Sequence, residues 1–347
     1  MHPIRVQGHG AQNAFAPWPC AEPSSAYNAG ADKCYPDEVG VRASPARQNA
    51  ARQMRRNGRL RPLMFVACGS ASASTPHMID LHCHLLPGID DGSPNLDTTL
   101  EMARIAVDDG ISTVFCTPHI YPGLYDNTGP DIRRRVDALR LVLADNGIDL
   151  SLSFGADVHL VPEVPDGLGS GRIPTLGGSR YLLLEPAHTV RPPRFLESVF
   201  ALQARGYVPV ITHPERLTWA DEHYADFLQL ARSGCWLQIT GGALLGNFGK
   251  RPQALAERLT GDGWTAVIAS DAHTTKRRAP RLQEALERAT QLVGRVEALR
   301  CVYDRPRAVM QNVSIESALR PPAFSDNAAE TGHSSSLKDK LRRWMGR

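Results

Sequence analysis

Apolar runs of strand length recur along the chain from Met78 onward, and most are separated by stretches with the apolar period of an amphipathic helix. The strand-like runs cover residues 78–83, 113–118, 150–158, 181–185, 208–212, 236–240 and 266–270. The helical stretches cover residues 96–109, 131–145, 194–205, 222–233, 252–262 and 281–299. Strands that alternate with helices in this way predict a parallel α/β architecture.

Histidines and carboxylates gather where these strands end. The residues in question are His82, His84, His119, Asp157, Glu185, His213, Asp271 and His273. Barrel enzymes carry their chemistry at the carboxyl ends of the strands, whereas an open sheet collects ligands at a single switch point. The pattern therefore predicts a TIM-like barrel of seven strands, closed or nearly closed, with its site at one end.

The two ends of the chain differ from this body. Residues 1–77 are rich in Ala, Pro, Gly, Ser, Asn and Arg and show no sustained period, which predicts a disordered extension. Residues 78–313 form the predicted domain, and residues 314–347 read as a flexible basic tail. The segment 337–345 has the pattern of a short basic amphipathic helix within that tail.

Composition excludes several classes of protein. The chain is 42% hydrophobic and 22% charged, as in ordinary globular proteins. Residues 1–77 contain nine basic and four acidic residues, so of the net charge of +3 the remaining chain carries about −2, which argues against a nucleic-acid binder. No apolar run reaches the roughly 18 residues of a membrane span. Seven scattered cysteines indicate reduced thiols and a cytoplasmic protein.

The segment Asp80-Leu81-His82-Cys83-His84 carries the sharpest chemical signal. Residues i and i+2 of a strand point to the same face, so both imidazoles can bind one ion, while Cys83 faces the other side. The loop that follows contains Asp90 and Asp91, either of which can bend back over the strand end. Together with the residues at the other strand ends, these side chains predict a centre of mixed His and carboxylate ligands, which suits Zn, Mn or Fe.

Cys301 lies six residues before Arg307, the spacing of the Cys and Arg in the cysteine-dependent tyrosine phosphatases. A thiolate mechanism needs a loop of free backbone N–H groups that cradle phosphate. The intervening residues contain no Gly, Pro306 lacks an N–H group, and Asp304 would repel phosphate. We therefore interpret this spacing as a coincidence.

The motifs Asp80–His84, Thr117-Pro118-His119, His213-Pro214-Glu215-Arg216 and Ser270-Asp271-Ala272-His273 resemble the PHP (polymerase and histidinol phosphatase) superfamily. Within it, the chain is most similar to the metal-dependent bacterial tyrosine-protein phosphatases of capsule and exopolysaccharide synthesis, over about residues 78–312. The resemblance implies a distorted seven-stranded PHP barrel and three divalent ions, with Mn expected first and Fe or Zn as alternatives.

The resemblance also implies a ligand set for each ion. His82, His84, Asp157 and Asp271 would hold the first ion, Asp91, His119 and His273 the second, and Asp157, Glu185 and His213 the third, with Asp157 bridging. The choice of Asp91 over Asp90 follows from the family alone. Relatives usually have Glu where this chain has Asp157, which makes that bridge the weakest assignment. His159 and His188 are expected to border the site without binding metal.

The expected activity is hydrolysis of phosphotyrosine on a protein by a metal-activated hydroxide, with Arg216 and Arg278 holding the phosphate. The resemblance implies a bacterial tyrosine autokinase of polysaccharide export as partner, and no nucleic acid. Two alternatives remain open at this point. One is another PHP phosphoesterase, such as a histidinol phosphatase or a nuclease. The other is a non-catalytic regulator that binds metal.

Overall fold

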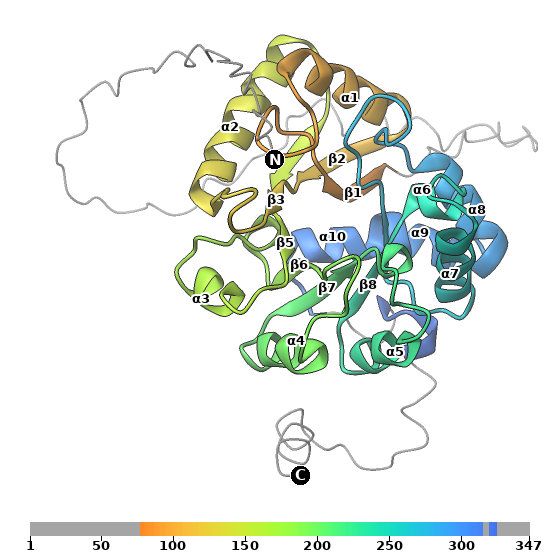
Figure 1. Cartoon of the computed structure of the whole chain (residues 1–347). Helices are drawn as coiled ribbons and strands as arrows, with labels where there is room; N and C mark the ends of the chain where they lie inside the picture. The colour runs from red at the N-terminus through yellow and green to blue at the C-terminus, as the bar shows by residue number, and fades with distance from the viewer. Residues whose placement is uncertain (1–76, 315–318, 325–347) are drawn as a thin grey trace, which may run out of the picture. The chain divides into compact units, whose positions relative to one another are not determined.

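Nine short parallel strands alternate with helices in the computed structural model, which describes residues 77–314 and 319–324 (Figure 1). The strands are β1 Met78–Cys83, β2 Ile111–Cys116, β3 His119–Ile120, β4 Ser151–Phe154, β5 Asp157–His159, β6 Tyr181–Glu185, β7 Val208–Thr212, β8 Trp236–Thr240 and β9 Val267–Ala269. The parallel α/β prediction is confirmed. The strand count differs from the expected seven because two of the predicted strands are interrupted.

The interruptions divide the strands between two sheets. One sheet has the order β1-β2-β4 and the other the order β3-β5-β6-β7-β8-β9. The chain passes from the first to the second at Thr117-Pro118, where proline has no N–H to donate, and again at Gly155-Ala156. At Gly155 a Cβ atom would lie 2.6 Å from Leu176 Cδ2, so a larger residue at that crossing would displace the Leu176 side chain.

Backbone contacts join β1 to the segment that follows β9. Cys83 forms an isolated bridge with Ala272, His84 N donates to Ala272 O at 2.9 Å, and Asp271 N donates to His82 O at 2.8 Å. The two sheets therefore form a ring of parallel strands. All of their carboxyl ends lie on the same side of this ring.

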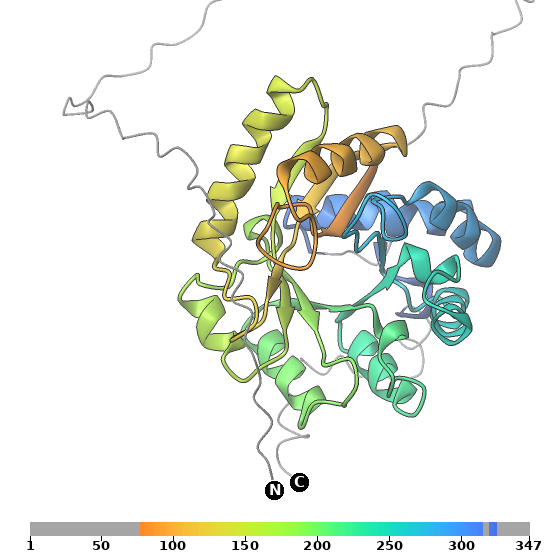
Figure 2. The ribbon, with the colours of Figure 1, turned by 45° about the horizontal axis from the view of Figure 1, so that its top comes forward.

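Helices surround the strands, most of them on the outside of the ring (Figure 2). They are α1 Leu96–Asp108, α2 Gly129–Asp145, α3 Val164–Gly169, α4 Phe195–Ala204, α5 Tyr224–Arg232, α6 Gly241–Leu244, α7 Lys250–Gly261, α8 Gln283–Val293, α9 Arg295–Leu299 and α10 Arg305–Met310. The Asn95 side chain caps α1 by accepting from Thr98 N at 2.9 Å. The predicted helix 281–299 is divided at Gly294, whose φ of 79° ends α8.

Apolar side chains fill the ring below the strand ends. Tyr181 and Leu183 share one face of β6 with Glu185, and Trp236 shares one face of β8 with Gln238. Tyr181, Leu183 and Trp236 belong to one buried cluster, together with Val309 of α10. This buried cluster therefore forms an apolar layer directly below the polar ends of the strands, and α10 contributes to it.

Part of the expected C-terminal tail packs on the domain. Ala323 N donates to Gly263 O at 3.2 Å, and the Phe324 ring lies 5.9 Å from that of Trp264. The buried Arg305 side chain donates to Leu319 O at 2.5 Å. The predictions for residues 1–76 and 325–347 lie outside the described residues.

Candidate metal centre

The carboxyl ends of the strands bring the predicted ligands together. β1 contributes His82, and His84 follows it directly; β3 begins with His119, β5 begins with Asp157, and β6 ends with Glu185. The remaining candidates follow the first, seventh and ninth strands: Asp91, His213, Asp271 and His273. Most of these side chains are buried, whereas that of Asp91 is 48% exposed.

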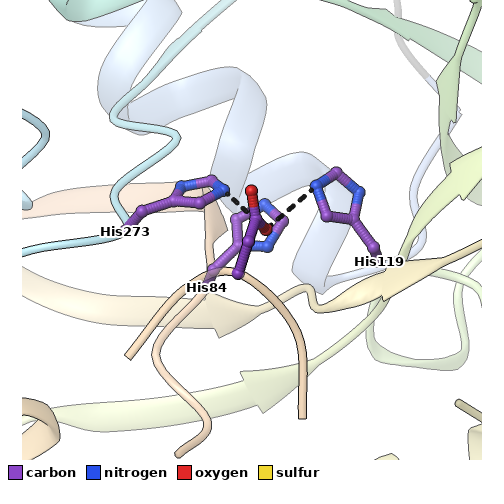
Figure 3. A group of neighbouring side chains, drawn as sticks. His84, His119 and His273 are labelled. Atoms are coloured by element: carbon purple, nitrogen blue, oxygen red, sulfur yellow. Dashed lines mark ion pairs between the residues drawn. The ribbon is translucent and has the colours of Figure 1, made fainter. Parts of the chain in front are cut away.

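Three imidazoles and one carboxylate form the first group. His84, His119 and His273 turn toward the Asp91 carboxylate (Figure 3), and one ligand atom from each lies within 4.8 Å of the others. Asp91 Oδ1 is 3.4 Å from His119 Nε2 and 3.3 Å from His273 Nε2. This geometry can hold one cation between the four side chains.

The second group surrounds two imidazole nitrogens that face each other. His82 Nε2 and His84 Nε2 are 3.1 Å apart, and Asp271 Oδ1 lies 3.5 Å from each. Asp157 Oδ2 lies 3.4 Å from His82 Nε2. Two imidazole nitrogens at this separation need either a proton or a cation between them.

Asp157 also reaches the remaining ligands. Its Oδ2 lies 3.5 Å from His119 Nδ1 and 3.9 Å from His213 Nε2, and His213 Nε2 lies 3.5 Å from Glu185 Oε1. The shorter aspartate arm therefore stands among the side chains of all three predicted ion positions. His188, which we expected to border the site, places Nε2 3.0 Å from Glu185 Oε1 and joins the group formed by Glu185 and His213.

Burial and neighbouring charges shift the pKa values of these groups in opposite directions. Burial lowers the pKa of His82, but the charges of Asp157 and Asp271 outweigh it and raise this pKa to about 9. Burial, with a smaller contribution from the charge of His273, lowers the pKa of His84 to about 4. Burial and the neighbouring Arg216 lower the pKa of His213 to about 4. Neutral His84 and His213 offer lone pairs to a metal.

Several buried polar atoms of the centre have no hydrogen-bond partner among the described residues. They are both carboxylate oxygens of Asp157 and the Nδ1 atoms of His119, His159 and His213. Buried polar atoms are normally paired, because leaving one unpaired costs about 1–3 kcal/mol. Cations bound by the nitrogen and oxygen donors would satisfy Asp157, and this mixed donor set suits Zn, Mn or Fe. The residues therefore fit a cluster of divalent ions.

A second set of residues orients the histidines. His82 Nδ1 donates to Gln238 Oε1 at 2.9 Å, and His84 Nδ1 lies 2.7 Å from Asp90 Oδ2. Asp90 also accepts from the backbone N–H of His119 and Gly92. The two adjacent aspartates thus differ in position. Asp90 contacts Nδ1 of His84, on the side of the ring away from the cluster, and Asp91 faces the cluster.

Close packing holds the loop that carries both aspartates. A Cβ atom at position 92 would lie 2.4 Å from Cβ and from the carbonyl oxygen of His84, so only glycine fits there. His213 and Asp271 have φ values of 33° and 50°, which non-glycine residues seldom adopt. Such strained backbone is concentrated at functional sites.

Two arginines lie against Asp271. Arg216 Nη1 and Arg278 Nη2 both pair with Asp271 Oδ2, the second at 2.9 Å. The Phe248 ring lies over both guanidinium groups, with its centroid 4.7 Å from Arg216 Cζ and 5.9 Å from Arg278 Cζ. The predicted phosphate-binding arginines are thus placed beside the cluster. Phe248 was not predicted from the sequence, because its loop shows no recognisable motif.

Aromatic rings border the other side of the centre. Tyr121 stacks on His159 with centroids 3.9 Å apart, and Tyr125 stacks on His119 at 5.6 Å. His159 Nδ1 lies 3.7 Å from Glu185 Oε2. The loop after β3 therefore supplies two tyrosines to the rim.

The Cys301–Arg307 spacing does not form a phosphate cradle. Cys301 is buried in a π-helical turn at 300–304, and its Sγ lies 3.7 Å from Thr265 O. Thr265 precedes β9, whereas the metal centre lies at the carboxyl ends of the strands. Burial raises the pKa of the thiol to about 11. Arg307 is exposed. The interpretation of this spacing as a coincidence agrees with these positions.

A family profile and individual relatives of this chain point to the same protein family. The profile described as "Capsular polysaccharide synthesis, CpsB/CapC" matches residues 78–311. Tyrosine-protein phosphatase YwqE of Bacillus subtilis is 39% identical over 211 residues, which cover 60% of this chain and 82% of YwqE. Tyrosine-protein phosphatase CpsB of Streptococcus pneumoniae is 25% identical over 244 residues, which cover 68% and 99% of the two chains.

A solved structure gives the same relationship. It is described as belonging to YwqE from Bacillus subtilis and CpsB from Streptococcus pneumoniae, "unique metal-dependent tyrosine phosphatases". It superimposes with a TM-score of 0.66 at 34% identity, and the match covers 69% of this chain and 96% of that one.

Proposed function

The chain belongs to the CpsB/CapC family of capsular polysaccharide synthesis, and we infer from this membership and from the site that it is a metal-dependent tyrosine-protein phosphatase. The observation that carries the inference is the cluster of His and carboxylate side chains beside two arginines. Metal ions that activate water and fixed cations that hold phosphoryl oxygens together suit phosphate monoester hydrolysis without a covalent intermediate.

We propose that three divalent ions bind, with Mn as the expected metal and Fe or Zn as alternatives. His82, His84, Asp157 and Asp271 would hold the first ion, Asp91, His119 and His273 the second, and Asp157, Glu185 and His213 the third. The proximity of Asp157 Oδ2 to His82, His119 and His213 supports its bridging role. When bound, such ions lower the pKa of water and neutralise phosphoryl oxygens.

The chain itself positions the substrate. Arg216 and Arg278 each use part of their five N–H donors on Asp271, so that other donors remain for phosphoryl oxygens. Asp271 and Phe248 hold both guanidinium groups before the substrate arrives, which lowers the cost of orienting them. Tyr121 and Tyr125 offer an aromatic rim to the phenol ring of the substrate.

The substrate is proposed to be a phosphotyrosine protein of the polysaccharide-synthesis system, with a bacterial tyrosine autokinase as the expected partner and the cytoplasm as the expected location. The family description and the names of the relatives support this proposal. None of the helices in the described part of the chain has both the length and the apolar character needed to span a membrane.

Three substrates test the function. The purified full chain is loaded separately with Mn²⁺, Fe²⁺ or Zn²⁺ and assayed on a phosphotyrosine peptide, a phosphoserine peptide and histidinol phosphate, with metal content measured alongside. We expect metal-dependent hydrolysis of the phosphotyrosine peptide with the highest kcat/KM. Activity confined to histidinol phosphate, or activity that persists without metal, would contradict the proposal.

A further inference from the structure

A small basic pocket adjoins the metal centre. The loops after β8 and β9 enclose about 90 Å³, lined by Lys276, Arg277, Arg278 and Arg281 together with Asn247 and Phe248. Arg278 and Phe248 belong to both places, because Arg278 pairs with Asp271 and Phe248 lies over Arg216. We call this the basic pocket.

The cations of the basic pocket are only partly neutralised. Arg277 Nη2 donates to the uncharged carbonyl of Asn247 at 2.5 Å, and Arg281 lies 3.9 Å from the nearest oxygen of Asp109. Lys276 is exposed and forms no ion pair within residues 77–314 and 319–324. Glu284 is the one acidic residue among the described residues that line the pocket.

An unused donor lies at the border between pocket and centre. Arg278 Nε is buried and has no acceptor in the described part of the chain, although Arg278 Nη2 is paired with Asp271. A buried N–H group without an acceptor is unusual in a folded protein. Excess positive charge and an unused donor together favour an anion.

We propose that the basic pocket is a second anion subsite, which binds a carboxylate or a second phosphoryl group on the same polypeptide that carries the phosphotyrosine. The volume accommodates several water molecules and therefore one such group. An extended peptide advances about 3.5 Å per residue, so this group lies within a few residues of the phosphotyrosine. The inference rests on the proposed phosphatase function and adds a preference for acidic or multiply phosphorylated segments.

Three peptides that differ only in their flanks test the subsite. One has Asp and Glu beside the phosphotyrosine, one has a second phosphotyrosine, and one has Gln and Ser. For the wild-type protein we expect the lowest KM with the anionic flanks and a preference that fades as salt rises. The first two peptides show whether carboxylate or phosphoryl is preferred.

The variants Lys276→Ala and Arg277→Gln change exposed residues outside the proposed catalytic set. Each should raise KM for the anionic peptides about two- to five-fold, the range for one exposed charge pair, and leave kcat/KM for the neutral peptide unchanged. Lys276→Glu should have the larger effect. Arg295→Ala, which removes an exposed arginine from α9, is the matched control and should change nothing.

Binding of the same peptides with a non-hydrolysable phosphonate separates the two proposals. If the protein hydrolyses all three peptides with equal KM, or if Lys276→Glu leaves the preference intact, the subsite is refuted and the phosphatase function stands. If no peptide is hydrolysed but anionic flanks strengthen binding in wild type and not in Lys276→Glu, the subsite stands and the function fails.

Discussion

Gln238 Oε1 lies 2.9 Å from Nδ1 of His82 in the buried interior of the ring. As the acceptor, it holds one imidazole proton on Nδ1, so that the proton displaced by a metal ion is the one on Nε2, which faces His84, Asp157 and Asp271. Gln238 thus sets the tautomer that a metal ligand needs.

We predict that Gln238→Leu lowers metal affinity about 10- to 100-fold, because His82 loses the group that fixes its ring and tautomer. Gln238→Glu retains an acceptor and should bind metal more tightly than Gln238→Leu does. Isothermal titration calorimetry with the metal ion measures the affinity of each variant. Equal affinities in the two variants and the wild type would show that the contact has no such role.

The double variant His82→Ala with His84→Ala should lose its phosphatase activity and most of its bound metal while it remains folded. Both side chains face the cluster, and the apolar layer of the ring does not depend on them. Circular dichroism, metal analysis and turnover are measured on the same sample. Wild-type turnover in a folded double variant would refute the metal mechanism.

Arg216→Ala should lower kcat/KM on a phosphotyrosine peptide roughly ten- to a thousand-fold, the scale of one positioned donor to developing charge. Arg216→Lys should recover part of the activity, because lysine keeps the charge without the planar fork. Metal content should remain, since Arg278 still neutralises Asp271. A change below about twofold in Arg216→Ala would exclude Arg216 from the site.

Cys301→Ser should retain near-normal activity. With the pKa of its buried thiol raised to about 11, only about one molecule in a thousand carries the thiolate at pH 8. The native protein should also resist thiol-alkylating reagents at this residue, which mass spectrometry of the alkylated peptide measures. Loss of activity in Cys301→Ser with normal metal content would instead support a thiolate mechanism.

Glu297 and Arg305 form a buried pair at 2.5 Å, so Arg305→Ala should destabilise the fold by about 3–5 kcal/mol. The reason is that Glu297 would keep its charge but lose its buried partner, and would retain only Arg300, whose partly exposed Nη1 lies 3.2 Å from Glu297 Oε2. Arg305→Met together with Glu297→Gln removes both charges and should restore much of the loss. Denaturant unfolding of the single and double variants gives these free energies, and equal stability of the single variant and the wild type would contradict the prediction.

The order of elements and the polar strand ends could be predicted from sequence, because apolar runs report burial and parallel strands place their carboxyl ends together. The boundaries were less accurate where tertiary contacts decide them. The run 150–158 was predicted as one strand, yet it divides after Phe154, next to Gly155, where a Cβ atom would lie 2.6 Å from Leu176 Cδ2.

Within the site, the histidines and carboxylates at the strand ends were predicted, whereas Gln238, in the middle of β8, was not. Gln238 looks like any polar residue in a buried strand, and only its partner His82 reveals its role. The sequence also offers no means to distinguish Asp90 from Asp91, because only the folded loop shows that Asp90 contacts His84 Nδ1 and that Asp91 contacts His273 Nε2.

Because the strands form two sheets, bound metal ions would also stabilise the fold by linking one sheet to the other. His82 belongs to the sheet of β1 and His84 follows that strand directly, whereas His119, Asp157 and Glu185 belong to the sheet of β6. Cations bound by ligands from both sides would connect the two sheets. At a free metal concentration of a hundred times Kd, such binding adds about 2.7 kcal/mol to the free energy of unfolding. A shortage of metal would then shorten the lifetime of the folded protein as well as remove its activity.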